Sequence, residues 1–340
     1  MQQRIEGPGN LLNEDGTLAH RGYATRAVLT YNRERIKAPA WKIKEWDFYQ
    51  VANDDRCVQL TIGHVSYAGE VSIRFFEFES GYRVDFSHML VLPFGRLNMP
   101  RTAESGDLAY RSKKVEMAFR VFDGGRRLSA KTRGDGKTPA FDIEIELEQP
   151  DNTGIVMATP FDEDERFFYY NHKINGMPAR GTVRVGGREY RFEPESAFGL
   201  LDWGRGVWPY RHEWYWGSGS GYVNGKRFGF NIGYGFGNTS AATENILFYD
   251  GTAHKLEHVY FDLPGGGGYM EKKVFTSDGG RFEMEFTPIY DRYTETKLLF
   301  VDTRCHQLFG KWNGRAVLDD GTVLEVKDLT AFVEHAVNRW

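Results

Sequence analysis

The clearest pattern in the chain is a strict alternation of apolar and acidic positions just before its midpoint. Phe141, Ile143, Ile145 and Leu147 are each separated from the next by a single acidic residue. Successive side chains of a β-strand point to opposite faces, so this spacing predicts a strand. We expect its four apolar side chains to be buried and its acidic side chains to be solvated.

Other segments also have the composition of strands. Runs rich in β-branched and aromatic residues predict strands over residues 58–65, 70–79 and 81–91. Helical periodicity is weak, and residues 329–337 are the best short helical candidate. Pairs that favour tight turns recur at short intervals, which is typical of antiparallel sheets. These pairs are Asp123-Gly124, Asn175-Gly176, Gly186-Gly187, Asn224-Gly225, Asp250-Gly251, Asp278-Gly279, Asn313-Gly314 and Asp320-Gly321.

The predicted strands are too numerous for one small barrel. The sequence therefore predicts an all-β fold with two consecutive antiparallel β-barrels or sandwiches. Glu193-Pro194 and Gly199 interrupt the strand pattern, which places the boundary near residues 195–210. We expect an irregular N-terminal lead-in over residues 1–40, a first β domain over 41–205 and a second over 206–340.

An aromatic hairpin is the most unusual local feature. Asn224-Gly225 lies between two strand-like arms and favours a two-residue type I′ turn. One face of the second arm is almost bare, so the rings opposite it either pack over the glycines or leave room for a ligand. Counting outward from the turn pairs Trp216 with Gly233, Trp214 with Gly235 and His212 with Gly237.

A bulge would change this register. Residues 217–221 alternate glycine and serine, and one extra residue there would move every partner to the other face. Glu213 and Tyr215 would then oppose the glycines.

Ionisable groups near the hairpin are the candidates for chemistry. Asp202 precedes Trp203, and a carboxyl group desolvated among aromatic rings would have the raised pKa that a general acid needs. The alternative is a buried ion pair between Asp202 and Arg205, or a turn cap. Glu334 and His306 also lie among apolar residues and could face the same cavity, although a satisfied core histidine is the commoner outcome.

Composition and charge narrow the class of protein to which the chain can belong. The formal net charge of -4 gives no electrostatic reason to expect nucleic acid as a partner. No apolar run approaches the roughly 18 residues that cross a bilayer, and the N-terminus lacks the apolar core of a secretory signal. Cys57 and Cys305 are expected to be reduced thiols in a cytoplasmic protein. We expect neither a metal nor a cofactor, and the sequence leaves the oligomeric state open.

Several motifs together resemble a bacterial family known as a domain of unknown function. More distantly, an Asp before Trp-Gly and a Trp-x-Trp strand resemble the lipocalin-like group of carotenoid hydratases, AttH proteins and tocopherol cyclases. That resemblance implies two lipocalin-like β domains. The motifs are Tyr31-Asn-Arg33, Lys44-Glu-Trp-Asp-Phe-Tyr49, Asp202-Trp-Gly-Arg-Gly206, Trp214-Tyr-Trp-Gly217 and His306-Gln-Leu-Phe-Gly310.

The resemblance also implies a reaction in which an acidic residue protonates an isolated alkene. Asp202 would be that acid, and Trp214 and Trp216 would form the walls of the pocket and stabilise the developing cation. The sequence departs from the hydratases because Asp202 is not followed by His and because Arg205 enters the motif.

Three functions follow as hypotheses. The first is an acid-catalysed hydratase, cyclase or isomerase acting on a small hydrophobic, isoprenoid- or lipid-like molecule. The second is a non-catalytic carrier of such a ligand, and the third is carbohydrate recognition. The candidate catalytic residues are Asp202, His212 and Glu334, and the candidate substrate-binding residues are Trp203, Arg205, Trp208, Tyr210, Trp214, Trp216, Gly233, Gly235 and His306.

Overall fold

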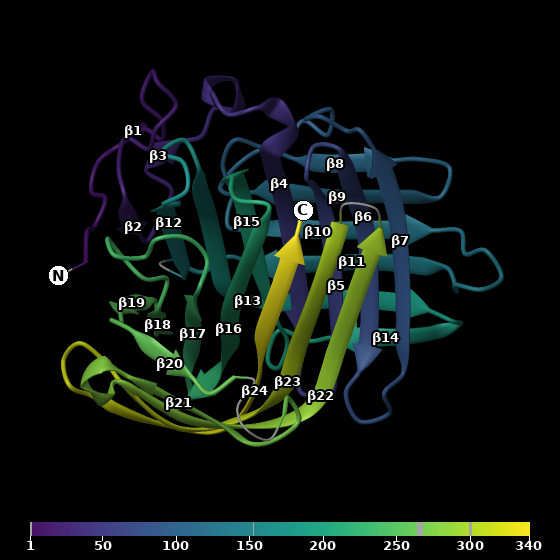
Figure 1. The fold of residues 1–340 in the computed structure, drawn as a ribbon. Coiled ribbons are helices and arrows are strands. Elements are labelled where there is room, and N and C mark those ends of the chain that lie inside the picture. Colours follow the sequence, from purple (N-terminus) through teal and green to yellow (C-terminus); the bar gives the residue numbers. More distant parts are fainter. Residues whose placement is uncertain (1, 152, 264–267, 299–300) are drawn as a thin grey trace.

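The computed structural model describes residues 2–151, 153–263, 268–298 and 301–340, and these are almost entirely β-strand (Figure 1). The prediction of an all-β fold is confirmed. In the described ranges the helices are three short 3-10 turns, and none is long or apolar enough to cross a membrane. These turns are η1 (Arg33–Arg35), η2 (Ala40–Lys42) and η3 (Asp278–Gly280).

The first large sheet has thirteen strands. Its hydrogen-bonded order is β7-β6-β5-β4-β15-β13-β11-β10-β9-β8, with β12 and β14 paired to β13 and β2 paired to β12. The strands are β2 (Gly22–Ala24), β4 (Ile43–Ala52), β5 (Arg56–His64), β6 (Ala68–Glu77), β7 (Arg83–Val91), β8 (Leu108–Arg111), β9 (Val115–Phe122), β10 (Gly125–Thr132), β11 (Phe141–Glu148), β12 (Gly154–Pro160), β13 (Phe168–Val185), β14 (Arg188–Phe192) and β15 (Phe198–Val207).

The second sheet has nine strands in the order β19-β18-β17-β16-β24-β23-β22-β21-β20. The chain passes from the first sheet to the second between β15 and β16. Both sheets are antiparallel and curled, which is consistent with two lipocalin-like domains. The strands are β16 (Arg211–Val223), β17 (Lys226–Tyr234), β18 (Ile246–Tyr249), β19 (Thr252–Lys255), β20 (Val259–Phe261), β21 (Lys273–Ser277), β22 (Phe282–Leu298), β23 (Val301–Val317) and β24 (Val323–Arg339).

The N-terminal forty residues are mostly irregular. They contain β2 and a small parallel pair, β1 (Gly9–Asn10) with β3 (Leu29–Thr30). Leu11 and Tyr31 are buried in the same core as the first sheet. This segment therefore packs on the first sheet.

The predicted strands over 58–65, 70–79 and 81–91 correspond to β5, β6 and β7. The strict alternation near the midpoint is strand β11, and its four apolar side chains are at most 1 % exposed. The helical prediction for residues 329–337 is wrong, because this segment belongs to β24. Strand β24 pairs with β23 along its length and with β16 over residues 331–339, and this long-range pairing outweighs weak local propensity.

Most of the predicted turns connect neighbouring strands. Asn224-Gly225 joins β16 to β17, and both residues have the positive φ of a type I′ turn. Two Asn-Gly pairs behave differently, because Asn175-Gly176 and Asn313-Gly314 lie inside the long strands β13 and β23. The pairing register shifts at each of them, so there these pairs make bulges rather than turns.

The two sheets pack against each other as well as around their own cores. In Figure 1 strands β22, β23 and β24 lie across the strands of the first sheet. Between them is an apolar cluster with Phe76 and Leu200 from the first sheet and Phe309 and Phe332 from the second. The C-terminus is drawn near the centre of the view, and the ring of Trp340 packs against Trp46 of β4.

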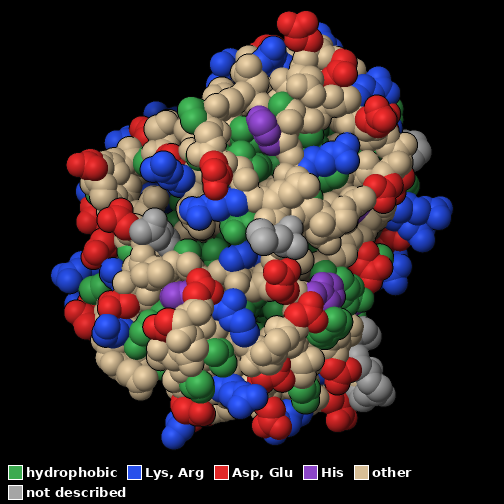
Figure 2. Space-filling model, turned by 90° about the vertical axis from the view of Figure 1, so that its left-hand side faces the viewer, with side chains coloured by type: hydrophobic (Ala, Val, Ile, Leu, Met, Phe, Trp, Pro, Cys, Tyr) green, Lys and Arg blue, Asp and Glu red, His purple; other side chains and the backbone are tan. Residues whose placement is uncertain are grey.

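The surface carries both signs of charge. Figure 2 shows Lys and Arg side chains interspersed with Asp and Glu side chains over one face. This mixture agrees with the small formal net charge of -4.

The core of the second sheet is centred on Trp312, which is fully buried and contacts Phe230, Phe275 and Phe286. We expect Trp312→Ala to lower the free energy of unfolding by about 3–5 kcal/mol, because it leaves a large cavity. Trp41→Ala is the control, because Trp41 is 53 % exposed and its loss should change stability by less than about 0.5 kcal/mol. Urea denaturation followed by circular dichroism measures both, and equal effects would contradict this view of the core.

Candidate active site

A cavity of about 420 Å³ lies between the two sheets. Strands β4, β5, β6, β7, β13 and β15 line it from one side, and β16, β22, β23 and β24 line it from the other. Asp202 and Glu334 both reach it, together with the rings of Trp46, Trp214 and Trp216. Two carboxyl groups from different sheets therefore share one aromatic chamber.

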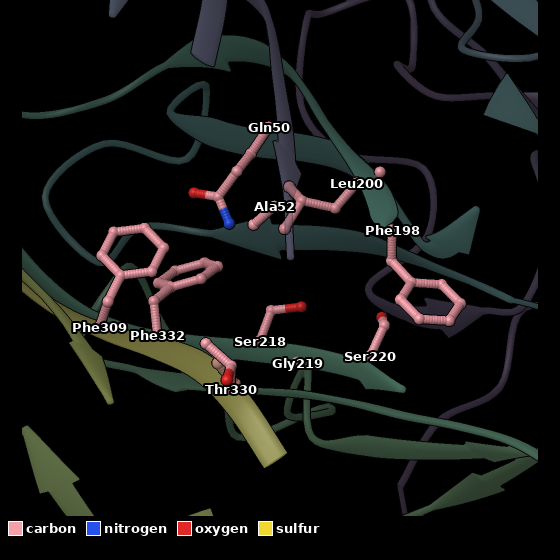
Figure 3. Close-up of a pocket in the computed structure, with 12 residues that line it drawn as sticks. Gln50, Ala52, Phe198, Leu200, Ser218, Gly219, Ser220, Phe309, Thr330 and Phe332 are labelled. Carbon is pink, nitrogen blue, oxygen red and sulfur yellow. The ribbon is translucent and has the colours of Figure 1, made fainter. Parts of the chain in front are cut away.

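A second gap in the same interface is much smaller. Figure 3 shows Gln50 and Leu200 from the first sheet pointing toward Ser218 and Phe332 from the second. The cavity there is about 30 Å³, which is no more than the share of one water molecule in the liquid. It can hold no organic substrate, so the larger cavity is the candidate site.

Strand pairing explains why Asp202 faces the cavity. Asp202 is the Cα partner of Phe48 on β4 and of Lys173 on β13. Partners directly opposite in a sheet share a face. All three side chains line the cavity, whereas Trp203, the next residue along β15, points to the opposite face.

Asp202 is held by two aromatic donors. The indole Nε1 of Trp46 donates to Oδ2 at 3.0 Å, and the hydroxyl of Tyr169 donates to Oδ1 at 3.4 Å. Burial raises the pKa of this carboxyl group, although the nearby charge of Lys173 acts in the other direction. A Cβ at position 204 would collide with the indole of Trp46. Gly204 therefore gives the indole the room it needs to reach Asp202.

Glu334 is held in a similar way from the second sheet. The indole Nε1 of Trp214 donates to Oε1 at 2.7 Å, and Gln307 Nε2 donates to Oε2 at 3.1 Å. Burial raises the pKa of Glu334 to about 7, and the charge of Asp202 adds to this effect. Lys173 and the Trp214 hydrogen bond only partly oppose it. About half of the Glu334 carboxyl groups are consequently protonated at pH 7, and more at lower pH.

The cation between these acids is itself neutralised. Lys173 forms an ion pair with Glu244 and lies 4.3 Å from the ring centroid of Trp216. Asn231 donates to Glu244 at 3.0 Å and accepts from the indole of Trp216 at 2.7 Å. This chain of contacts fixes the indole and the lysine in one arrangement.

On the glycine-rich face of β17, Gly233 makes room for a charged side chain, which the sequence did not suggest. A Cβ at position 233 would collide with the carboxylate of Glu244. Gly233 therefore leaves room neither for a flat indole nor for a ligand, but for the counterion of Lys173. Gly235 lies just beyond the strand with a φ of +91°, and its space adjoins the backbone of Glu213 and Trp214.

The predicted hairpin register is confirmed for Trp216, which is the Cα partner of Gly233. No bulge occurs in residues 217–221. The ladder between β16 and β17 ends at Tyr215. Gly235 lies against the backbone of Trp214 just beyond the end of the ladder, whereas Gly237 lies against Thr159 and Pro160, so the predicted pairing of His212 with Gly237 is wrong. On the other side of β16, Trp214 and His212 pair with Ala336 and Asn338 of β24.

The predicted ion pair between Asp202 and Arg205 is wrong. Arg205 lies on the opposite face of β15, fully buried, and binds Asp47 at 2.8 Å. Its guanidinium also lies 4.1 Å from the ring centroid of Trp203. Alternation along β15 places Arg205 and Trp203 on the face away from the cavity, where Trp203 is part of the core of the first sheet.

His212 lies beside the cavity rather than in its lining. Its ring stacks on Trp214 with centroids 5.7 Å apart, and its Nδ1 donates to the Pro209 carbonyl at 3.1 Å. Burial lowers the pKa of His212 to about 3, so the imidazole is neutral. The position suits a support for Trp214 and not a proton donor.

The remaining candidates lie outside the cavity lining. Trp208 is buried against the rings of Trp46 and Trp340, and Tyr210 is 49 % exposed. His306 donates a hydrogen bond from Nδ1 to the Asp291 carboxylate at 2.7 Å, and its ring stacks on Tyr269. The neighbouring Gln307 points to Glu334, so alternation puts His306 on the other face of β23.

Sequence reasoning missed several of the lining residues: Trp46, Tyr169, Lys173, Phe236, Glu244 and Trp340. Trp46 and Phe48 share a face of β4, and their alternation was a usable signal. Nothing local marks Lys173 or Glu244. Among the residues that the structure describes, no three His, Cys, Asp or Glu side chains are grouped so as to hold a metal ion.

The fold and the cavity together define a class: a lipocalin-like all-β protein with two curled sheets and an acidic, aromatic site between them. The chain belongs to the family described as a domain of unknown function, DUF2804, whose model matches residues 2–340. No curated protein matches the chain significantly.

Two solved structures share the fold. An AttH-like protein from Nitrosomonas europaea has a TM-score of 0.52 and 11% identity, with 86% of this chain and 92% of that chain covered. Kievitone hydratase from Nectria haematococca has a TM-score of 0.54 and 8% identity, with 98% of each chain covered. The resemblance inferred from the tryptophan motifs is thereby confirmed at the level of fold.

The raised pKa of Glu334 has a consequence for stability. Between its ordinary value of 4.5 and about 7, the folded chain holds a proton that the unfolded chain releases. Folding stability contributed by this group is complete below pH 4.5 and is lost as the pH rises to 7. We expect wild type to lose roughly 3 kcal/mol relative to Glu334→Gln across this window. Denaturant titrations of both proteins at several pH values measure the difference, and parallel pH profiles would contradict it.

Proposed function

We propose that this protein is an acid-catalysed hydratase, cyclase or isomerase acting on a small hydrophobic, isoprenoid- or lipid-like alkene. The observation that carries the proposal is the pair Asp202 and Glu334, buried in one aromatic cavity, with the pKa of Glu334 raised to about 7 so that a large fraction carries a proton at neutral pH. A neutral carboxylic acid in an apolar site is the donor that alkene protonation requires. The shared fold with a hydratase supports the same reading.

For a hydration, the proposal assigns each carboxyl group a role. Glu334 transfers its proton to one alkene carbon, and the π bond breaks to leave a cation on the other carbon. Asp202 takes a proton from water as the water oxygen bonds to that cation. Water has then been added across the double bond, and transfer of the proton from Asp202 back to Glu334 restores the starting state.

The rings of Trp214 and Trp216 would stabilise the cation. An aromatic face attracts a desolvated cation by on the order of 2 kcal/mol. Each indole N–H is already bound, Trp214 to Glu334 and Trp216 to Asn231, so the ring orientations are fixed before substrate arrives. In this proposal His212 positions Trp214 and does not transfer a proton.

A non-catalytic carrier would use the same cavity, and the two functions differ in a measurable way. Incubation of the purified protein with isoprenoid alkenes in ¹⁸O-labelled water, followed by mass spectrometry, detects hydration directly. Ligand binding without any incorporation of label, cyclisation or double-bond shift would support the carrier and overturn the enzyme.

We expect Glu334→Gln and Asp202→Asn each to lower turnover about 100-fold or more, the usual contribution of a general acid or base. Ligand affinity and the folded structure should change little, because amides preserve the shape of both side chains. Glu213→Gln is the matched control, since Glu213 lies on the opposite face of β16 and binds His335 at 2.6 Å. Wild-type turnover in either cavity variant would exclude that carboxyl group from the reaction.

The proposed acid also fixes the pH profile. Glu334 must be protonated, so kcat should fall about tenfold per pH unit above its pKa of about 7. The residual activity of Asp202→Asn should keep this alkaline limb, and that of Glu334→Gln should lack it. A profile that stays flat to pH 9 in wild type would assign the proton to another group.

A further inference from the structure

Arg292 is a buried cation with no counterion among the residues that the structure describes. It lies on β22 with only 7 % of its surface exposed. Its Nε is buried with no hydrogen-bond partner, and no carboxylate of a described residue lies within 4.0 Å of the guanidinium. An uncompensated charge in this position costs several kcal/mol, so its presence in an interior calls for an explanation.

The side chain faces the cavity side of the second sheet. Arg292 is the Cα partner of Gln307, which is in turn the partner of Glu334. Thr294 and Thr296, two and four residues further along β22, share its face and line the cavity. Arg292 therefore stands in the same row as the proposed acid, on the strand two places away, beside the residues that line the cavity rather than among them.

The surrounding charges do not neutralise it. Arg74 of β6 lines the cavity nearby, but its charge is balanced by Glu70 at 3.1 Å. Asp85 is already paired with Arg83. Burial, and next the charge of Arg74, lower the pKa of Arg292 to about 10, so it stays charged at neutral pH. Among these five side chains the two ion pairs cancel, and the positive charge of Arg292 is left over.

We propose that Arg292, with Arg74 beside it, binds the carboxylate of the substrate, and that the substrate is an amphipathic monocarboxylic acid with its unsaturated apolar part among the tryptophans. A guanidinium offers two parallel N–H donors that match a planar carboxylate. A single unbalanced positive charge fits a monoanion better than a phosphate ester with nearly two negative charges. The reaction type in this proposal rests on the proposed function, but the binding does not.

The strand spacing limits where the double bond can lie. Two strand-to-strand steps separate the backbones of Arg292 and Glu334 by about 10 Å. The carbon that accepts the proton is therefore several bonds from the carboxylate. An isolated, remote alkene fits this geometry, and an alkene conjugated to the acid does not.

Citronellate and citronellol are suitable probes, because they share one isoprenoid skeleton with a remote double bond and differ in the acidic group. Isothermal titration of the wild-type protein should show citronellate binding about tenfold or more tightly than citronellol, the contribution expected of charged hydrogen bonds. Arg292→Met should remove this preference by weakening citronellate alone. Arg101→Met, at a residue paired with Glu34 on the surface, is the matched control and should bind as wild type.

Thermal melting separates ligand binding from a structural role. If Arg292 exists for a ligand, ligand-free Arg292→Met should melt at or above the wild-type temperature, because an unpaired buried charge has been removed. Added citronellate should raise the melting temperature of wild type but not of the variant. Arg292→Lys should fold and bind citronellate with intermediate affinity.

Two results would overturn the inference. One is equal affinity of wild type for the acid and the alcohol, and the other is a parallel loss of both affinities in Arg292→Met and Arg292→Lys. The proposed function can fail independently of this inference. If citronellate binds through Arg292 but is never hydrated or rearranged, the binding site is supported and the reaction is not. If citronellol is turned over and the protein shows no preference for the acid, the reaction is supported and the binding site is not.

Discussion

Burial of ionisable groups between two aromatic-lined sheets is the constraint on which the rest of this structure depends. Neither Asp202 nor Glu334 could persist there with its oxygens unsatisfied, and an indole N–H meets each of them. An indole satisfies a carboxyl oxygen without bringing a positive charge. The acids are thus stabilised in place while their proton affinity stays high, which an arginine partner would have prevented.

The same constraint explains the composition of the strands around the cavity. Gly204 gives the Trp46 indole room to reach Asp202, and Gly233 gives the Glu244 carboxylate room to pair with Lys173. Each glycine costs roughly 0.5–1 kcal/mol of chain entropy relative to alanine. The hydrogen bond or ion pair that it permits offsets that cost.

Charge is balanced at one end of the cavity and left unbalanced at the other. Lys173 has Glu244, and Arg74 has Glu70, whereas Arg292 has no counterion among the described residues. In our proposal this imbalance gives the cavity a direction, with the acid donor Glu334 among the tryptophans and the Arg292 guanidinium toward β22. A ligand with one apolar and one anionic end complements both halves.

Local pattern determined the strands, most of the turns and the pairing of Trp216 with Gly233, because two-residue periodicity and positive-φ turn residues act over a few positions. The shared fold also followed from short tryptophan motifs. Only the tertiary structure determined the partners of the ionisable side chains. Arg205 pairs with Asp47, His306 lies on the face of β23 away from the cavity, and Glu334 of the last strand lines the same cavity as Asp202. These contacts join residues more than a hundred positions apart or depend on which face of a strand is buried. No local preference encodes them, since the packing of one sheet on the other sets them.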